Sequence, residues 1–309
     1  MNLATAAVLG ALGLDILLGE LPESLHPVRW FGRAIEPADR TWHHPRPAGV
    51  LAALVFSGMA AAVSGLLVVV TATRSMAGGV GLAAVVLFVA TSYRKLLGTV
   101  WRVCQRAETD LVAARRGVTA LVGRDASDFD AGQIRSAALE SLAENLADGL
   151  VAPLFAFVLG AAVGHLLDLT AECTLALACA GAVWLKAVNT MDSMWGYPGR
   201  PFGTAAALLD DLAMWIPSRL TAALIAGSFL APRSILLARR WVGGVPSPNA
   251  GWPMGTLAAA LDVRLEKPGS YVLNSTGDAP VSAHVEQALR RLGVAGLAAY
   301  ALAGLVLWY

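Results

Sequence analysis

The stretch LALACAGAVWLKAVNTMDSMWGY, residues 175–197, decides the fold class and points to a functional surface. Its first half carries no charged residue, which is typical of a helix in a membrane or in a deep protein core. The run then ends in Lys186, Asn189, Thr190 and Asp192, although a single glycine would be enough to stop a helix. We interpret this change as a polar site at a membrane surface.

The composition of the whole chain supports a membrane setting. Of 309 residues, 56% are hydrophobic and only 15% are charged, whereas a soluble domain carries about 25% charged residues. The net charge of +1 does not indicate nucleic-acid binding, which normally requires a strongly basic face. The cysteines form no C-x-x-C pair, so we expect buried thiols rather than a zinc site or a disulfide framework at Cys104, Cys173 and Cys179.

Apolar segments of near-membrane length recur along the chain, and polar segments separate them. The sequence therefore predicts an all-α, polytopic integral membrane protein with about five to seven membrane-embedded helices and helical cytoplasmic segments. We expect one integral membrane domain over 1–309. The shorter run 220–231 could be re-entrant, interfacial or a tilted partial span. The predicted spans lie at about 2–18, 48–72, 78–98, 150–167, 171–188 and 293–309.

The lysines and arginines divide unequally between the two sides of the predicted topology. If the N-terminus is outside, 22 of the 23 basic residues face the cytoplasm, and only Arg74 lies in an outer connection. Positive residues favour the cytoplasmic side of a membrane. We therefore expect a multi-pass protein of the cell membrane whose polar motifs all face the cytoplasm.

The first polar cluster lies in LDILLGELPESLHPVRWFGR, residues 14–33. Asp15, Glu20, His26 and Arg29 flank prolines that stop the helix. An arginine beside a helix end is suited to recognition of phosphate or carboxylate. Arg33 and Arg40 are better explained as anchors on the positive side of the membrane.

The second cluster is ALESLAENLADGLVAPLF, residues 138–155. Glu140, Glu144 and Asp148 recur every four residues and so share one face of a regular helix, with Asn145 beside them. Like charges at this spacing repel, and a divalent cation such as magnesium would offset the repulsion. A solvated helix face is the alternative, but the stripe runs directly into an apolar span.

The third cluster is the polar end of the opening stretch. If the helix continues, Lys186, Asn189 and Ser193 lie on one face, with Asp192 beside them. A lysine at a membrane boundary often only extends its ammonium toward the aqueous phase. From the residues alone, a functional site and such a boundary lysine remain equally supported.

The fourth cluster is LLDDLAMWIPSRL, residues 208–220. Asp211, Trp215 and Arg219 are spaced four apart and would share a helix face. Asp210 and Asp211 could hold a metal on phosphate, or could simply start a helix and interact with its dipole. The following GVPSPNAGWP, residues 244–253, offers Ser247 and Asn249 in a segment whose glycines and prolines predict a loop.

Taken in order, these motifs resemble the adenosylcobinamide-phosphate synthase family of cobalamin biosynthesis (CbiB/CobD). The likeness extends over about residues 10 to 270. The residues that carry it are LDILLGE with HPVRWFGR, LVGRD, ESLAENLADGLVAPLF, KAVNTMDSMWGY, DDLAMWIPSRL and SPNAGWP. The chain departs from the family pattern at Met214, where asparagine is usual, and at Met254, where glutamate is usual.

The resemblance implies a membrane enzyme that uses ATP and Mg²⁺. The expected partners are adenosylcobyric acid, (R)-1-aminopropan-2-ol or its O-phosphate, the lipid bilayer and other membrane-associated corrinoid enzymes, but no nucleic acid. The product would be an amide, formed through an acyl phosphate, and the corrinoid would be a substrate rather than a cofactor. The alternative is a membrane transporter or a signalling paralogue without ligase activity.

The resemblance also implies roles for the polar residues. The catalytic residues would be Lys186, Asp192, Glu144 and Asn189. Binding of substrate and phosphate would fall to Arg29, His26, Arg219, Asn145, Ser247 and Asn249. The metal ligands would be Glu140, Glu144, Asp148, Asp210 and Asp211. A transporter should instead carry ionisable groups near mid-span, and Asp15 is the main residue of that kind.

Overall fold

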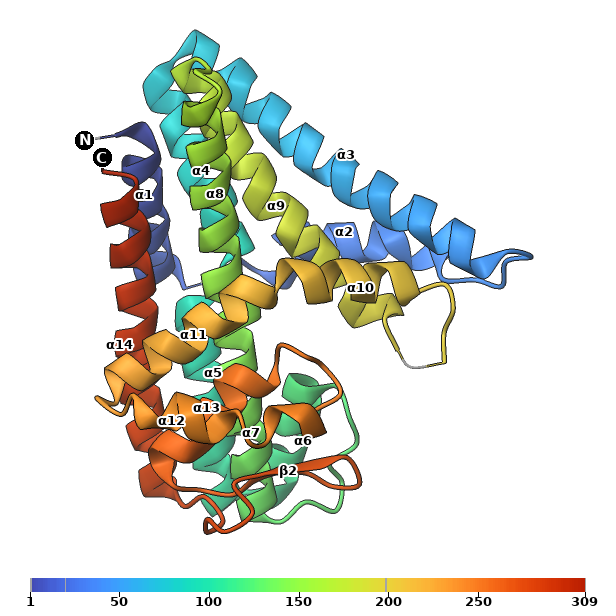
Figure 1. The fold of residues 1–309 in the computed structure, drawn as a ribbon, viewed down its shortest axis with the longest axis vertical. Helices are drawn as coiled ribbons and strands as arrows, with labels where there is room; N and C mark the ends of the chain where they lie inside the picture. The colour runs from blue at the N-terminus through green and yellow to red at the C-terminus, as the bar shows by residue number, and fades with distance from the viewer. Residues whose placement is uncertain (1, 20, 198, 309) are drawn as a thin grey trace. The chain divides into compact units, whose positions relative to one another are not determined.

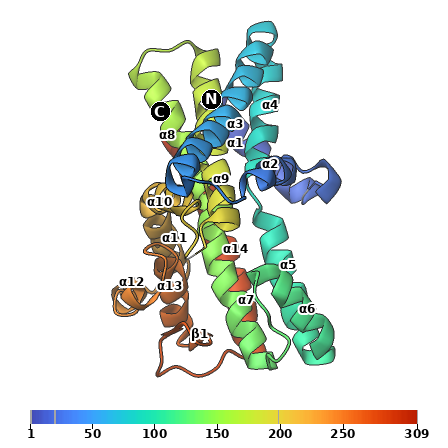
Figure 2. The ribbon, with the colours of Figure 1, turned by 90° about the vertical axis from the view of Figure 1, so that its right-hand side faces the viewer.

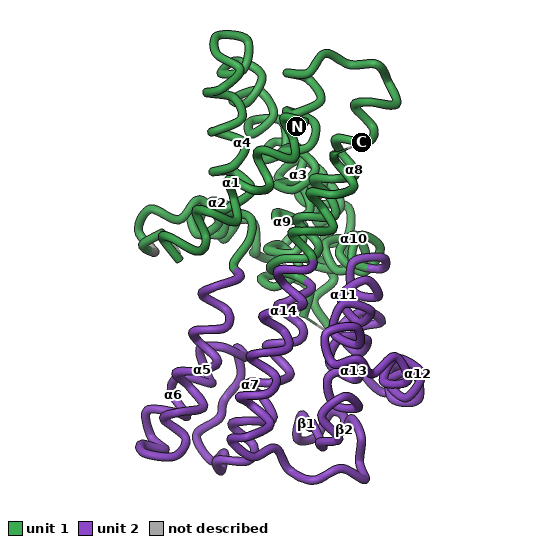
Figure 3. Tube along the Cα trace, turned by 90° about the vertical axis from the view of Figure 1, so that its left-hand side faces the viewer, with its two compact units in different colours: residues 1–92, 148–214, 299–309 green, residues 93–147, 215–298 purple. Residues whose placement is uncertain are grey.

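The chain folds almost entirely into helices (Figures 1 and 2), as a computed structural model describes it for residues 2–19, 21–197 and 199–308. Glu20, from the first predicted cluster, lies outside the described residues. The chain divides into two compact units, 1–92 with 148–214 and 299–309, and 93–147 with 215–298, coloured separately in Figure 3. The expected single domain over 1–309 stays a prediction.

Unit 1 holds most of the apolar helices. Polar segments between them form the short α2 and α10, and the first part of α14 belongs to unit 2. The helices are α1 (Leu3–Leu18), α2 (Pro27–Ile35), α3 (Pro45–Arg74), α4 (Met76–Ala90), α8 (Ala152–Leu166), α9 (Ala171–Trp195), α10 (Thr204–Ala213) and the end of α14 (Ser282–Val306).

Unit 2 combines helices with one small hairpin. The strands β1 (Leu265–Lys267) and β2 (Tyr271–Leu273) pair antiparallel, with Leu265 opposite Leu273. The helices are α5 (Tyr93–Thr109), α6 (Leu111–Val122), α7 (Ala131–Leu146), α11 (Trp215–Ser228), α12 (Arg233–Ala238), α13 (Gly251–Leu261) and the first part of α14.

Five helical segments are long and apolar enough to cross a membrane: Pro45–Arg74, Met76–Thr109, Ala131–Leu166, Ala171–Trp195 and Ser282–Val306. This confirms the predicted all-α, polytopic membrane fold. The predicted N-terminal span forms the 16-residue α1, which is apolar but shorter than those five. The run at 220–231 belongs to α11, whose 14 residues extend about 21 Å and so fall short of the hydrocarbon core.

Two of these segments are interrupted at the same place in unit 1. The predicted span 78–98 breaks at Thr91 and Ser92, between α4 and α5. The other segment widens into a π-helix at Ala147–Val151, just before Pro153. Proline lacks an N–H and crowds the carbonyl four residues earlier, which is that of Gly149. The N–H of Ser92, at the first break, donates to this carbonyl at 2.9 Å. One hydrogen bond therefore pairs a backbone donor of the first interruption with a backbone acceptor of the second.

Small residues allow α8 and α9 to approach closely in unit 1 (Figure 2). A Cβ on Gly160 would lie 2.5 Å from the carbonyl oxygen of Leu177, and one on Gly181 would lie 2.6 Å from that of Ala156. Close packing of small residues is a common way to join helices in membranes, where lipid removes the hydrophobic driving force between them. This contact fixes the position of α9, which carries the polar end of the opening stretch.

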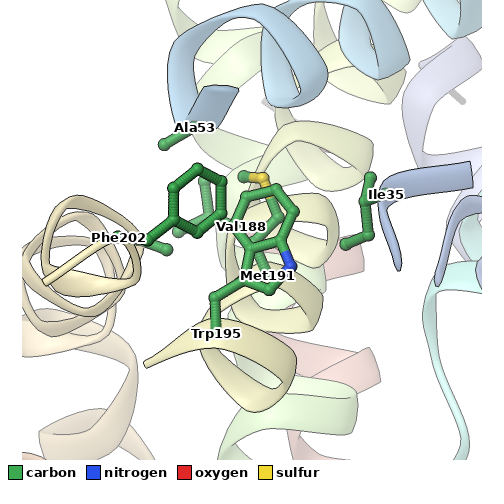
Figure 4. Close-up of a cluster of buried hydrophobic side chains, with 7 residues drawn as sticks. Ile35, Ala53, Val188, Met191, Trp195 and Phe202 are labelled. Atoms are coloured by element: carbon green, nitrogen blue, oxygen red, sulfur yellow. The ribbon is translucent and has the colours of Figure 1, made fainter. Parts of the chain in front are cut away.

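An aromatic cluster surrounds the C-terminal end of α9 (Figure 4). The buried indole of Trp195 lies between Phe202 and Ile35, and its ring meets that of Phe202 edge to face at 5.0 Å. Met191 and Val188 of α9 complete the contact from the same helix. The cluster connects α9 to the chain that leads into α10, and so it positions both helices of the candidate site.

Two expectations about local structure are corrected. Cys104 and Cys179 are buried as expected, but Cys173, in the first turn of α9, is exposed. The loop expected at 244–253 is shorter, since α13 begins at Gly251 and includes Pro253 in its first turn. Proline is tolerated there because the first N–H groups of a helix have no partner within the helix.

Candidate functional site

Helix α9 continues through the polar end of the opening stretch, as the third cluster required. The hydroxyls of Thr190 and Ser193 donate to the carbonyls of Lys186 and Asn189 on their own helix, at 2.7 and 2.9 Å. These hydroxyls are therefore occupied locally. The other polar side chains at this end of α9 are those of Lys186, Asn189 and Asp192.

The buried amide of Asn189 joins three elements of unit 1. Its Nδ2 lies 3.2 Å from Oδ2 of Asp148, in the π-helical segment, and 3.4 Å from Oδ1 of Asp210, on α10. An asparagine amide has two N–H groups, which is the number needed to serve both carboxylates. Residues that are distant in sequence thus converge on one side chain.

The position of Asp210 and Asp211 excludes one of their two interpretations. Two aspartates that start a helix would lie in its first turn, but α10 runs from Thr204 to Ala213, so Asp210 and Asp211 lie in its last turn. The helix ends there because Pro217 crowds the carbonyl of Ala213. Carboxylates are unfavourable at a helix C-terminus, where the dipole is negative. Their position must therefore be stabilised by something other than the helix.

Mutual repulsion adds to this cost. Burial raises the pKa of Asp210 to about 8, and the negative charges of Asp148, Asp192 and Asp211 act in the same direction. The hydrogen bond from Asn189 acts against the shift. Asp192 also interacts electrostatically with Asp211, and Lys186 with Asp148. We name Asp148, Lys186, Asn189, Asp192, Asp210 and Asp211 the acid–lysine cluster.

The chemistry of the acid–lysine cluster fits a magnesium ion that carries phosphate. Among the described residues, no group of three or more His, Cys, Asp or Glu side chains is arranged to enclose a metal. Magnesium, however, usually binds through one or two carboxylates and fills its remaining positions with water and substrate phosphates. Asp148 and Asp210, which share one amide donor, provide such a pair.

The predicted acidic stripe divides between the two units. Asp148 belongs to unit 1, where the π-helix departs from the regular four-residue spacing, whereas Glu140 and Glu144 belong to α7 in unit 2. Glu140 is buried and accepts hydrogen bonds from Tyr271 at 2.8 Å and Ser136 at 3.2 Å. The Glu140 carboxylate also pairs with Arg124 at 3.6 Å, so protein groups already surround it.

The neighbours of Glu140 on α7 differ from it. Glu144 is half-buried and interacts electrostatically with the Tyr271 hydroxyl. Asn145 donates its amide to the carbonyl and hydroxyl of Ser141, one turn earlier, at 2.9 and 3.0 Å. The Asn145 side chain therefore hydrogen-bonds within its own helix, α7. The metal role predicted for Glu140 and Glu144 and the binding role predicted for Asn145 stay predictions.

Arg219 lies in an aromatic clamp in unit 2. Its guanidinium carbon is 4.4 Å from the ring centre of Trp215 and 5.1 Å from that of Trp252. Its Nη1 donates to the carbonyl of Trp215 at 2.7 Å and to Oδ1 of Asn249 at 3.2 Å. Ser247 supports the loop by accepting from the N–H of Asn249 at 3.2 Å. The structure thus brings together Arg219, Asn249 and Ser247.

The helical face expected for the fourth cluster is only partly present. Asp211 lies on α10, whereas Trp215 and Arg219 lie on α11 after the break at Met214. The expectation of one continuous face was therefore wrong at Asp211. Pro217 supplies the physical reason, because a regular helix cannot pass through its position without losing a hydrogen bond.

The remaining predicted residues lie on other elements. His26 is the residue before α2 and Arg29 lies exposed in its first turn, while α2 packs on α9 where Gly32 approaches Met194. Met214 and Met254, the two departures from the family pattern, are both buried. The sulfur of Met254 lies 3.7 Å from the Tyr271 hydroxyl. This thioether therefore contacts the same hydroxyl that donates to the Glu140 carboxylate.

Sequence reasoning missed two partners of the predicted residues. Tyr271 follows Glu140 by 131 positions and reaches it through the β-hairpin, and Trp252 completes the clamp from α13. Neither contact has a helical spacing that could reveal it. The hairpin register was the missing information for Tyr271, while Trp252 stood within a motif already singled out.

Comparisons with known proteins agree on one family. A family model described as CobD/Cbib protein matches residues 8–292. A "Probable cobalamin biosynthesis protein CobD" of Methanothrix thermoacetophila is 37% identical, with 96% of this chain and 95% of that protein covered. A "Cobalamin biosynthesis protein CobD" of Rhodobacter capsulatus is 35% identical, with 100% and 99% covered. No solved structure matches the chain.

Proposed function

The chain belongs to the CobD/CbiB family, and on this basis we propose that it is an ATP-dependent amide-forming ligase of cobalamin biosynthesis. It would join adenosylcobyric acid to (R)-1-aminopropan-2-ol or its O-phosphate. The role in cobalamin biosynthesis follows from the family and its relatives. The reaction type, the substrates and the use of ATP and magnesium are the proposal.

The proposed reaction has two steps. A carboxylate oxygen of the corrinoid first attacks the γ-phosphorus of ATP, the bond to the bridging oxygen breaks, and ADP leaves. The amine, after losing a proton to a base, then attacks the acyl carbon, a C–N bond forms, and phosphate leaves. Activation is needed because a free carboxylate would have to expel oxide. No enzyme nucleophile takes part in this route.

The observation that carries the proposal is the convergence of Asp148 and Asp210 on Asn189. Bound magnesium would neutralise phosphate charge and lower the cost of keeping these carboxylates together. Lys186 would contact a phosphate oxygen as charge moves to the leaving group. Asp192 and Asp211 remain in the same cluster to complete the metal's surroundings or to accept the proton of the ammonium.

In unit 2 we propose a binding role for the aromatic clamp. The two rings hold the Arg219 guanidinium in place, and Asn249 occupies only one of its edges. A preorganised guanidinium is suited to phosphate or carboxylate. Glu144, as a further acidic ligand, and Arg29 with His26, as phosphate-binding groups, complete the proposed set.

The proposed location is the cell membrane, with the catalytic groups facing the cytoplasm. The support is the division of charge, since 22 of the 23 basic residues fall on that side of the expected topology. ATP and the two substrates would then be reached directly from the cytoplasm. Other membrane-associated corrinoid enzymes are proposed partners.

The decisive experiment traps the activated corrinoid. Purified protein with ATP, magnesium and adenosylcobyric acid should form a corrinoid hydroxamate when hydroxylamine replaces the amine, and should release ADP. Lys186→Met should remain folded and form none, whereas Lys95→Met, at another helix, is the matched control. Release of AMP and pyrophosphate would overturn the acyl phosphate. Absence of any ATP-dependent product would favour a transporter or signalling protein.

A further inference from the structure

A cavity of about 360 Å³ lies in unit 1 beside the start of α10. Arg46, from the first turn of α3, forms one side, and Tyr197, Arg200 and Thr204 contribute the other polar groups. No carboxylate is among its described lining residues. The described lining therefore carries two guanidinium groups and no carboxylate, whereas the neighbouring acid–lysine cluster is acidic.

The two arginines differ in how they are held. Nη1 of Arg200 donates to Asp39 at 2.9 Å, and its guanidinium carbon lies 5.3 Å from the ring centre of Tyr197. A guanidinium has five N–H groups, so these contacts orient Arg200 and leave further donors. Arg46 makes no hydrogen bond or ion pair within the described part of the chain. Its guanidinium is exposed to solvent and accessible to an anion.

The backbone adds donors to this cavity. Helix α10 has 10 residues, and its N-cap, Gly203, provides no side-chain hydrogen bond. The first N–H groups of the helix therefore receive no cap from the N-cap side chain, and Thr204, the first residue of the helix, lines the cavity. Guanidinium groups combined with helix N-terminal amides make a favourable environment for phosphate.

The cavity adjoins the acid–lysine cluster through one residue. Gly196 lines the cavity, and a Cβ placed on it would lie only 1.9 Å from Oδ1 of Asp192. Thr204 and Asp211 also share a face of α10, two turns apart, which corresponds to about 10 Å. A phosphate in the cavity would therefore lie at the flank of the carboxylates rather than among them.

We propose that this cavity binds a phosphate group. The phosphate could belong to a soluble substrate or to a lipid headgroup, and both sources present the same oxyanion. Assignment to a substrate rests on the ligase function proposed above, whereas phosphate binding itself does not. Arg46 and Arg200 provide the charge, and Thr204 and the first amides of α10 provide neutral donors.

The test measures binding without turnover. Protein in phosphatidylcholine nanodiscs is titrated calorimetrically with pyrophosphate, ATP, 1-aminopropan-2-ol O-phosphate and the unphosphorylated amino alcohol. We expect Arg200→Gln and Arg46→Gln each to raise the Kd of at least one phosphate-bearing probe tenfold or more. Neither variant should alter binding of the amino alcohol. Arg33→Gln, an exposed arginine of α2 that does not line the cavity, should change nothing.

The variants also separate failure of the site from failure of the fold. Arg46→Gln removes a charge that has no partner to lose, so its thermal unfolding should match that of the wild type. If both variants bind every phosphate probe as the wild type does, or if the wild type binds none and retains no anionic lipid, the proposal is overturned.

The lipid source is tested in a second arm. Wild-type and Arg46→Gln protein are each placed in nanodiscs that contain phosphatidylglycerol, and the lipid that each retains is compared by mass spectrometry. If Arg46→Gln loses phosphatidylglycerol but binds the soluble probes unchanged, the result would support the phosphate site and overturn its assignment to a substrate. Conversely, intact binding of a soluble phosphate in protein that makes no amide would support the cavity while refuting the ligase.

Discussion

The side-chain amide of Asn189 donates to the carboxylate of Asp148 at 3.2 Å and thereby fixes α9 against the π-helical segment. The second N–H of the same amide serves Asp210 on α10 at 3.4 Å. Asn189 is thus a neutral donor shared by two acids that would otherwise repel. Under the proposed function Asn189 positions the carboxylates, and its loss should then affect the magnesium requirement more than folding.

We expect Asn189→Ala to reduce ligase turnover about 10- to 100-fold, because a hydrogen bond to a charged group contributes about 1.5–3 kcal/mol. The magnesium concentration for half-maximal activity should rise as well. Steady-state assays at several magnesium concentrations measure both effects. Asn2→Ala, which removes the N-cap of α1, is the control and should leave the magnesium requirement unchanged. An unaltered requirement in Asn189→Ala would contradict this role.

The pKa of Asp210 leads to a prediction about stability and pH. Its folded-state pKa, raised to about 8 by burial and neighbouring charges, exceeds the ordinary value. The native state therefore holds the proton more tightly than the unfolded state. This contribution to stability is complete below pH 4 and is lost as the pH rises through 8.

Thermal unfolding of the metal-free protein between pH 4 and 9 measures this effect. Asp210→Asn should weaken the decline and be more stable than the wild type near pH 9. Magnesium should restore the wild type at that pH and have less effect on the variant. Equal pH profiles for the two proteins would remove Asp210 as the titrating group.

The exposed Cys173 provides a natural reporter of topology. It lies in the first turn of α9, at the connection expected outside the cell, whereas Cys104 and Cys179 are buried. An impermeant maleimide should therefore label intact cells at this residue, and Cys173→Ser should abolish the labelling. Labelling only after the membrane is opened would reverse the proposed orientation of every polar motif.

The sequence predicted the membrane helices because hydrophobic segments long enough to cross a bilayer are a local property of the chain. It also singled out Asp148, Asn189 and Asp210 as candidate site residues, which stays a prediction, but it did not reveal that one amide joins them. The π-helix before Pro153 and the break before Pro217 escaped prediction, although both prolines were visible in the sequence. A proline restricts the helix before it, but whether the result is a π-helix, a break or a kink depends on tertiary partners such as Ser92.

Contacts between residues far apart in the sequence were the other limit on predicting the site from sequence. The stripe of Glu140, Glu144 and Asp148 was read from a helical period, which the π-helix interrupts before Asp148. The Glu140 carboxylate accepts a hydrogen bond from Tyr271, which lies on the hairpin, far along the chain. Periodicity can place residues on a face, but it cannot state which segment covers that face.

The contact between α8 and α9 provides a test of the fold. Gly160→Ala would place a Cβ 2.5 Å from the carbonyl oxygen of Leu177, so the two backbones must separate. Overpacking of this kind typically costs about 1–3 kcal/mol, and we expect a clear fall in the melting temperature. Gly58→Ala on α3 is the matched control, since no atom lies within 4 Å of its new Cβ. Equal melting temperatures would show that the helices can adjust freely.

The aromatic clamp predicts that Arg219 cannot be replaced by lysine. A guanidinium stacks its plane between Trp215 and Trp252 while donating to Asn249, and an ammonium cannot do both. We therefore expect Arg219→Lys to raise the KM of a phosphate- or carboxylate-bearing substrate at least tenfold, although the charge is retained. Asn249→Ala should have a smaller effect of the same kind, because the two rings still orient the guanidinium. Arg239→Lys, on the short segment after α12, serves as the matched control and should behave as the wild type. A wild-type KM of Arg219→Lys for every substrate would contradict this prediction, because charge alone would then be enough for binding. The stacking would have only a structural role in that case. A lower melting temperature without a change in kinetics would reveal such a role.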